Sequence, residues 1–348
     1  MRKLRLKFQK NFSRLTGVFL LFPLLLANGC LPSSPENQGG RFITLYGFSI
    51  MKEALEGDIY PAFTTKWKAE NSGEDLSFNS SFAGSETVTN QILQGTPADI
   101  AILSIERDVT RLAEGKFVTT EWQNAPNKGI VNKTPFVILV RKGNPKNIKD
   151  FADLGKPDVK IIHPDPVSSG GAQWSILAIY GSELMKTKAE TGQPDSNRAR
   201  QTLQSVWNNV ISTPGSAREA RTQFETGYGD ALITYELEGL LMKQAGKPVD
   251  IVIPKATIFS EHPAVIIDRN INDVKRPSIE AFYKYLWSDE AQKAFVKYHF
   301  RSVNDAFNDA NPEFAKIEMP FTVELFGGWS RAFPEIIEGV FQKQIQKK

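Results

Sequence analysis

Short runs of β-branched and aromatic residues alternate along this chain with stretches in which apolar residues recur every three or four positions. The runs are typical of strands and the stretches of helices. Strands are predicted over residues 41–46, 76–78, 98–103, 136–140, 159–163, 231–235 and 251–253. Helices are predicted over residues 85–93, 172–180 and 279–295 and over a C-terminal amphipathic segment. A further helix is predicted from Leu55, Ile59, Phe63 and Trp67, which recur every four residues, and Pro61 is expected to kink or divide it. This alternation predicts an α/β fold with largely parallel sheets.

The distribution of these elements predicts two domains. Two strand–helix units precede about residue 135, two more follow before about residue 255, and the rest of the chain is mainly helical. A chain of 348 residues is also longer than one ordinary domain core requires. In α/β proteins, ligands bind at the carboxyl ends of strands, where helices begin. The helix starts are therefore the places to search for a binding site.

The N-terminal segment has the anatomy of a secretory signal. A basic stretch ends at Arg14, and Leu15–Leu26 is mainly apolar but shorter than the roughly 20 residues that span a bilayer. Ala27-Asn28-Gly29-Cys30 resembles a bacterial lipobox, in which the cysteine is lipidated, with alanine where leucine is usual. Cys30 is the only cysteine, so no intramolecular disulfide can form, and the alternative reading is a free buried thiol. Residues 1–30 are predicted to be a signal peptide with a lipobox, and residues 31–40 a flexible tether.

The charge balance changes once this segment is set aside. The chain has 42 Lys and Arg against 39 Asp and Glu, but six of the basic residues lie in the first 29 positions, where no acidic residue occurs. Subtracting these six leaves 36 basic residues against 39 acidic ones. A basic footprint for nucleic acid is therefore absent from the sequence. An anionic ligand would have to be held by local geometry and not by a positive bulk field.

One helix start combines several features of an anion site. Ser168-Ser169-Gly170-Gly171-Ala172-Gln173-Trp174 follows a predicted strand and opens a predicted helix. The first N–H groups of a helix have no internal partner and carry the positive end of the helix dipole. Ser169 adds a hydroxyl donor, and Gly170 and Gly171 have no Cβ atom to keep an oxyanion away from the backbone. The alternative is an ordinary serine cap with a glycine-rich turn.

Two further helix starts have similar features. In Pro214-Gly215-Ser216-Ala217-Arg218-Glu219, Ser216 and Glu219 have the spacing of a capping box, and backbone N–H groups near Ser216 and Ala217 could be free. In Ala83-Gly84-Ser85-Glu86, Ser85 could cap the helix or donate to a ligand. For both, a purely structural helix cap is the alternative.

Taken together, these helix starts resemble those of the periplasmic sulfate- and thiosulfate-binding proteins of ABC importers. The most specific marks are the VRKGNP sequence of residues 140–145, the SSGGAQW sequence of residues 168–174, GDALI of residues 229–233 and FGGW of residues 326–329. The resemblance implies the type II periplasmic-binding-protein fold, which has two α/β lobes joined by two crossover segments. Residues 41–135 and 253–348 are then expected to form lobe 1, and residues 136–252 lobe 2.

The resemblance also implies which residues hold the ligand. The family binds sulfate without a counter-charge, through backbone amides, hydroxyls and an indole N–H. Ser85 matches the serine donor of lobe 1, and Ser169, Gly170 and Gly171 match the cradle of lobe 2. The next amide falls on Ser216 or Ala217. Tyr235 stands where the family usually has tryptophan, and Ser49 lies near Ile50-Met51, where the family usually has Asp-Pro.

The resemblance implies a monomeric, lipid-anchored periplasmic protein that delivers sulfate or thiosulfate to the permease subunits of an ABC importer. Alternatives of the same fold are a phosphate- or molybdate-binding protein or an anion-sensing subunit. An enzyme is not expected, because His163, His262 and His299 lie far apart and CxxC, HExxH, GxSxG and GxxxxGK[ST] motifs are missing from the sequence. Asp99, Glu106 and Asp108 hint at a metal, but acids after a strand usually cap helices or face water. No cofactor or metal is expected.

Overall fold

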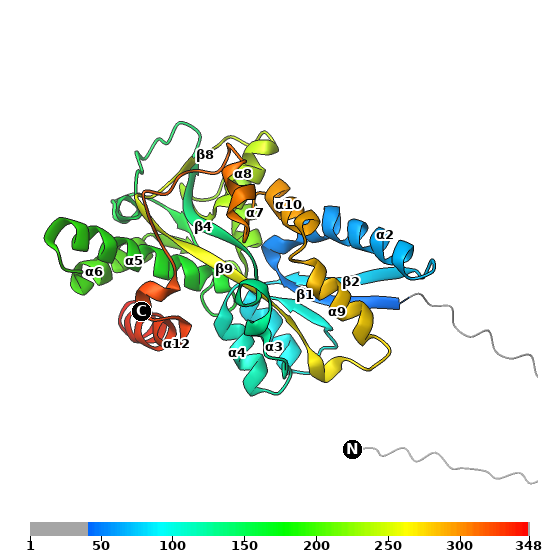
Figure 1. The fold of residues 1–348 in the computed structure, drawn as a ribbon. Coiled ribbons are helices and arrows are strands. Elements are labelled where there is room, and N and C mark those ends of the chain that lie inside the picture. Colours follow the sequence, from blue (N-terminus) through cyan, green and yellow to red (C-terminus); the bar gives the residue numbers. More distant parts are fainter. Residues whose placement is uncertain (1–40, 347–348) are drawn as a thin grey trace, which may run out of the picture. The chain divides into compact units, whose positions relative to one another are not determined.

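The computed structural model describes residues 41–346, in which strands and helices alternate as the sequence pattern predicts (Figure 1). The strands are β1 (Arg41–Phe48), β2 (Leu76–Ala83), β3 (Ile100–Ile102), β4 (Ile130–Arg141), β5 (Ile161–Ile162), β6 (Val210–Ser212), β7 (Ala231–Tyr235), β8 (Val249–Val252), β9 (Ala256–Ile266), β10 (Arg301–Ser302) and β11 (Met319–Phe321). The main helices are α2 (Tyr60–Glu70), α3 (Ser85–Leu93), α4 (Glu106–Glu114), α5 (Gly170–Thr191), α6 (Ser196–Asn208), α7 (Ala217–Glu225), α8 (Glu236–Gln244), α9 (Arg276–Tyr285) and α10 (Asp289–Lys297).

The strands follow the order β2-β1-β3-β9-β4-β7-β5-β6. At one end β1 pairs in parallel with β2 and β3, and at the other β5 pairs in parallel with β6 and β7. The prediction of parallel strands is therefore correct for these two groups. It is incomplete at the centre, where β4 and β9 pair with each other and with β7 and β3 in antiparallel fashion.

Strand β4 connects the two groups of parallel strands. Its first half pairs with β9 up to Pro135, and from Phe136 onwards it pairs with β7. Strand β9 likewise pairs with β4 and then with β3. The fold is that of a two-lobed binding protein of type II, with β4 and β9 as the crossover segments. The exact lobe limits stay a prediction, although β4 changes partner where the sequence analysis places one of them.

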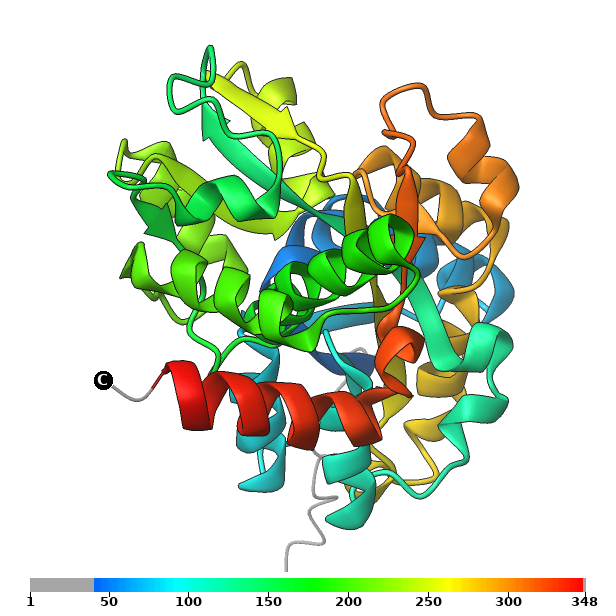
Figure 2. The ribbon, with the colours of Figure 1, turned by 90° about the vertical axis from the view of Figure 1, so that its left-hand side faces the viewer.

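The C-terminal segment packs where the sequence analysis does not place it. Short helix α12 (Trp329–Ala332) continues into the π-helical segment η8 (Phe333–Ile345). This segment lies beside α5 (Figure 2) and contacts α5 and α6. The Trp207 and Phe341 rings are 4.6 Å apart, and those of Trp174 and Trp329 are 4.7 Å apart. This aromatic packing holds the C-terminal segment against α5 and α6, and the assignment of residues 253–348 to lobe 1 stays a prediction.

Two helix predictions differ from the structure in detail. The helix expected over residues 279–295 is two helices, α9 and α10, because Ser288 caps α10 by accepting a hydrogen bond from the Ala291 amide at 3.2 Å. Helical structure runs without a gap through Pro61, from α1 (Lys52–Ala54) through the π-helical segment η2 (Leu55–Ile59) into α2. A π-turn accommodates a residue that lacks an N–H, so Pro61 changes the helix type without breaking the helix.

Buried apolar clusters fix the helices that begin near the strand ends. Val88 of α3 and Val109 of α4 pack with Val265 of β9, and all three are fully buried. Phe224 of α7 packs with Leu232 of β7 in a separate cluster. The larger cluster contains residues of both strand groups. Each helix is thereby held against the sheet, and the position of its first turn is set by the core.

Candidate functional site

The N-terminal ends of α3, α5 and α7 meet at one place. A Cβ atom on Gly84, which precedes α3, would lie 2.2 Å from the carbonyl oxygen of Ser168 and 2.7 Å from that of Gly215. Ser168 lies just before α5, and Gly215 just before α7. The Ser168 hydroxyl also donates to the Gly215 carbonyl at 2.8 Å. Only glycine fits at position 84, and the positive ends of three helix dipoles are brought together.

The start of α5 offers donors that have no partner. Ser169 is the N-cap residue and is 3% exposed, yet its hydroxyl makes no capping hydrogen bond. Within residues 41–346 the amides of Gly170 and Gly171 have no hydrogen-bond acceptor, whereas the Ala172 amide donates to the Ser169 carbonyl at 3.1 Å. Two buried amides and a hydroxyl are therefore available to an acceptor, as a helix N-terminus that binds an anion requires.

The two glycines of this cradle face hydroxyl groups. A Cβ atom on Gly170 would lie 2.9 Å from the Ser104 Cβ and 3.2 Å from that of Ser85. A Cβ atom on Gly171 would lie 2.7 Å from the Tyr235 hydroxyl. Side chains at either position would collide with buried neighbours. The structure thus brings Ser85 and Tyr235 to the cradle, as the sequence analysis predicts.

Ser104, which sequence analysis missed, joins the elements around the cradle. Its amide donates to the Ser85 hydroxyl at 2.9 Å, and its carbonyl accepts from the Trp174 indole N–H at 2.7 Å. Its own hydroxyl is 2.8 Å from that of Tyr235. Ser104 follows β3 closely, so its place near a strand's carboxyl end is the signal that could have identified it. Trp174 is fully buried and is also a hydrogen-bond donor.

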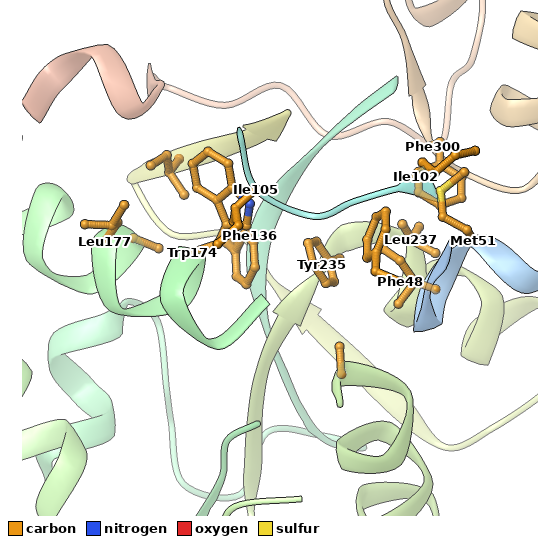
Figure 3. Packing of buried hydrophobic residues seen from close by; sticks show 14 of the residues in the cluster. Phe48, Met51, Ile102, Ile105, Phe136, Trp174, Leu177, Tyr235, Leu237 and Phe300 are labelled. Carbon is orange, nitrogen blue, oxygen red and sulfur yellow. The ribbon is translucent and has the colours of Figure 1, made fainter. Parts of the chain in front are cut away.

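Tyr235 ends β7 and lies in the core, between Phe136 on one side and Phe48 on the other (Figure 3). Its ring centroid is 4.6 Å from that of Phe136 and 6.2 Å from that of Phe48. The side chain is 1% exposed, and this burial raises the pKa of Tyr235, so the phenol is neutral. A neutral hydroxyl can donate or accept a hydrogen bond, unlike an indole, which only donates.

The Ser85 hydroxyl is already engaged. It donates to Asp108 Oδ2 at 2.5 Å while it accepts from the Ser104 amide. Asp108, in the first turn of α4, is completely buried. Burial and the nearby Glu86 carboxylate raise the pKa of Asp108 to about 8. The expectation that this acid caps a helix or faces water is wrong, because its side chain points into the interior at Ser85.

The start of α7 adds two more free amides. The Ser216 hydroxyl accepts from the Glu219 amide at 3.2 Å, which is the predicted cap. The amides of Ser216 and Ala217 have no acceptor in the part of the chain that the structure describes. The Ser49 hydroxyl lies 3.4 Å from the Arg218 amide, a long contact that places Ser49 at the same helix end. All eight ligand-binding residues that the sequence analysis names thus lie at or beside the three helix starts.

The charged groups near α7 are paired with one another. Arg218 donates to Glu53 Oε2 at 2.8 Å and to Glu238 Oε1 at 3.0 Å. Glu238 is fully buried and also accepts from Arg221. Because Arg218 is neutralised by two carboxylates, the anion site depends on dipoles and hydroxyls. A donor site of this kind suits a small oxyanion.

The histidine that precedes the cradle in the sequence is held by hydrogen bonds inside the protein. His163 is buried, its Nδ1 is 2.7 Å from the Pro164 carbonyl, and its Nε2 contacts the Ser175 hydroxyl. Burial lowers the pKa of His163 to about 4, so the ring is neutral. Among residues 41–346, no group of three His, Cys, Asp or Glu side chains is placed to hold a metal ion.

Comparisons with known proteins agree with this geometry. The model of a family described as bacterial extracellular solute-binding protein matches residues 43–301. A sulfate-binding protein of Synechococcus elongatus is 34% identical to this chain, and the match covers 88% of this chain and 86% of that protein. A thiosulfate-binding protein of Escherichia coli is 33% identical, and the match covers 84% of this chain and 86% of that protein. The solved structure of the sulfate-binding protein SubI from Mycobacterium tuberculosis has a TM-score of 0.76 and 31% identity over 85% of this chain and 99% of that one. This chain therefore belongs to the family of bacterial extracellular solute-binding proteins.

Proposed function

We propose that this protein captures sulfate, or the closely related thiosulfate, outside the cytoplasm and delivers it to the permease subunits of an ABC importer. The observation that carries the proposal is the meeting of three helix starts, whose free amides include those of Gly170, Gly171 and Ala217. The Ser169 hydroxyl adds a further donor. Relatives that bear the names sulfate-binding and thiosulfate-binding protein, at 33–34% identity, support the same ligand class.

The chemistry of the donors favours sulfate over phosphate. Sulfate is fully deprotonated at neutral pH and only accepts hydrogen bonds, which amides and hydroxyls at helix starts supply. A protonated phosphate brings an O–H group, and a buried polar group without a partner costs about 1–3 kcal/mol. The hydroxyls of Ser104 and Tyr235 can accept as well as donate. This observation favours phosphate as a second candidate, and molybdate binding or an anion-sensing role is an alternative within the same fold.

The proposed location follows from the family and from the N-terminal sequence. Cys30 and the signal-like segment lie outside the residues that the structure describes, so the lipid anchor remains a proposal that depends on the lipobox-like sequence. Between residues 41 and 346 the structure contains no helix with the length and apolarity to cross a membrane. We propose that an acylated Cys30 and the 31–40 tether hold a monomeric binding protein at the membrane surface.

Titration calorimetry with sulfate, thiosulfate, phosphate and molybdate tests the ligand. The chain from Leu31 includes every described residue and is suitable for the assay. Ser169→Ala removes one charge-assisted hydrogen bond, worth about 1.5–3 kcal/mol, and should weaken sulfate binding by about one to two orders of magnitude. Ser205→Ala, on the exposed face of α6, is the control and should bind as the wild type does. Wild-type affinity in a folded Ser169→Ala protein would contradict the cradle assignment.

A further inference from the structure

A completely buried carboxylate stands directly behind one of the proposed ligand-binding hydroxyls. Asp108 Oδ2 accepts the hydrogen bond of Ser85, and Asp108 Oδ1 has no hydrogen-bond partner in residues 41–346. The Arg111 guanidinium approaches Oδ1 only to 3.6 Å. A carboxylate that lacks both water and a full set of donors is poorly stabilised in its ionised form. Neither the family resemblance nor the cap pattern explains why this acid is buried here.

The charged groups around Asp108 do not neutralise it. Glu86, on α3, receives hydrogen bonds from Arg107 at 2.7 Å, from Arg111, and from the Gln173 amide of α5 at 2.9 Å. The two arginines of α4 are therefore directed mainly at Glu86. Burial and the negative charge of Glu86 raise the pKa of Asp108, and the arginines oppose this rise only in part.

The buried imidazoles of His163 and His262 do not titrate near neutral pH. Burial lowers the pKa of His163 to about 4 and that of His262 to about 3. His163 contacts Ser175, and His262 contacts Asn132, so neither imidazole touches Ser85 or Asp108. The phenol of Tyr235 is neutral because burial raises its pKa. Asp108 thus differs from these groups, because its raised pKa lets its protonation state change near neutral pH.

The protonation state of Asp108 decides what Ser85 can offer to a ligand. When Asp108 is ionised, the Ser85 proton is donated to Oδ2, and Ser85 presents only a lone pair to the cradle. When Asp108 carries a proton, its O–H can donate to Ser85 Oγ, and the Ser85 proton is free to turn to the ligand. The Ser85 Cβ lies 3.2 Å from where a Cβ on Gly170 would be, so this hydroxyl is next to the cradle.

We propose that Asp108 is a specificity-determining positioning residue, which takes up one proton from solvent when a fully deprotonated oxyanion binds, so that Ser85 becomes a donor to that anion. This rests on the proposed oxyanion-binding function. A proton-bearing anion such as hydrogen phosphate can instead donate its own O–H to Ser85 while Asp108 stays ionised, and its binding needs no proton uptake. The same site thereby distinguishes two classes of oxyanion by the proton that each brings.

The sign of the pH dependence follows from linkage. Sulfate binds the state in which Asp108 is protonated, and that state is fully populated below the pKa of Asp108. Affinity for sulfate should be constant at low pH and fall as the pH rises through about 8, by up to about tenfold for each further pH unit.

The test is calorimetry of sulfate binding between about pH 6.5 and about pH 9.5 in buffers of different ionisation enthalpy, which counts the protons taken up. The wild type should take up nearly one proton per sulfate at the alkaline end. In Asp108→Asn the side-chain amide donates to Ser85 at every pH. The sulfate affinity of this variant should therefore not vary with pH across the range, and it should take up no proton on binding. Glu106→Gln is the matched control, because Glu106 lies in the same turn of α4 and its carboxylate accepts from Gln123. It should behave as the wild type does.

Each result has a distinct meaning. Wild-type protein that binds sulfate without proton uptake, or Asp108→Asn that keeps the uptake, would overturn the role of Asp108 and leave the proposed function intact. Absence of sulfate binding at every pH would overturn the proposed function. If circular dichroism shows Asp108→Asn to be unfolded, Ser85→Ala replaces it: it should bind sulfate more weakly at low pH and lose the pH dependence. If the affinity of Ser85→Ala for sulfate still depended on pH, Asp108 would not act through the Ser85 hydroxyl.

Discussion

Replacing Gly171 by alanine should abolish tight anion binding while leaving the fold in place. The added Cβ would lie 2.7 Å from the Tyr235 hydroxyl and 3.0 Å from its Cε2 atom, both inside normal contact distance. Tyr235 is 1% exposed and bonded to Ser104, so it has little room to move away. Overpacking of this kind typically costs about 1–3 kcal/mol.

The effect on affinity should exceed the effect on stability. The new methyl group would push against the Tyr235 hydroxyl beside the cradle, and the ligand is expected to lose at least one charge-assisted hydrogen bond, worth about 1.5–3 kcal/mol. Sulfate affinity should fall by about one to two orders of magnitude, measured by titration calorimetry. The melting temperature without ligand should fall by a few degrees, at most about 2–4 °C for each kcal/mol lost, because that range applies to domains smaller than this chain.

Gly181→Ala supplies the matched control on the same helix. A Cβ there would lie 2.5 Å from Phe321 Cε2 and 2.8 Å from Phe326 Cζ, a similar clash away from the cradle. This variant should lose stability but keep its affinity for sulfate. If Gly171→Ala binds within about twofold of the wild type, or if both variants lose affinity equally, the position of the anion over Gly171 is wrong.

The remaining predictions concern the lipid anchor and a movement in which the two lobes are expected to close around the ligand. Cys30→Ser should leave the precursor uncleaved by lipoprotein peptidase and release it from membranes; processing and membrane attachment like those of the wild type would refute the anchor. Glu53→Gln should weaken the contact of α1 with Arg218 and reduce sulfate affinity by no more than about fivefold, since a partly exposed ion pair contributes at most about 1 kcal/mol. Small-angle scattering should show that the radius of gyration decreases more on sulfate binding in Glu53→Gln than in the wild type. Identical radii of gyration with saturating sulfate and without ligand would argue against closure.

Local sequence signals were sufficient to locate the helix starts of the site. Helix caps can be recognised from residues a few positions apart, because capping is a local interaction. Examples are Ser169 with its two following glycines, and Ser216 with Glu219. Ser104 and Asp108 have no such signal. Ser104 contacts Tyr235 across 131 positions of sequence. The pKa of Asp108 is raised only when folding buries its carboxylate beside Ser85 and Glu86 of α3.

Strand β9 was missed for a related reason. Its sequence ATIFSEHPAVI includes Thr257, Ser260 and His262, which weaken the apolar pattern of a strand. Each of these polar side chains is buried against β4: Thr257 donates to the Phe136 carbonyl at 2.7 Å, Ser260 donates to a β4 carbonyl, and His262 contacts a β4 asparagine. Polar residues satisfied by a distant strand look like loop residues until the partner is known.

The pairing of β4 with β9 has a mechanical consequence. These strands form a two-stranded antiparallel ribbon, with a register shift between Ile130 and Asn132, and each also pairs with strands of one or the other group. A ribbon resists sharp folding, because bending it would break the hydrogen bonds that pair its strands, but it twists readily. Movement of one group of parallel strands relative to the other should therefore be a twist distributed over several residue pairs of β4 and β9, and not a rotation about a single hinge residue. The ribbon would store elastic energy as it turns and return it when the ligand leaves.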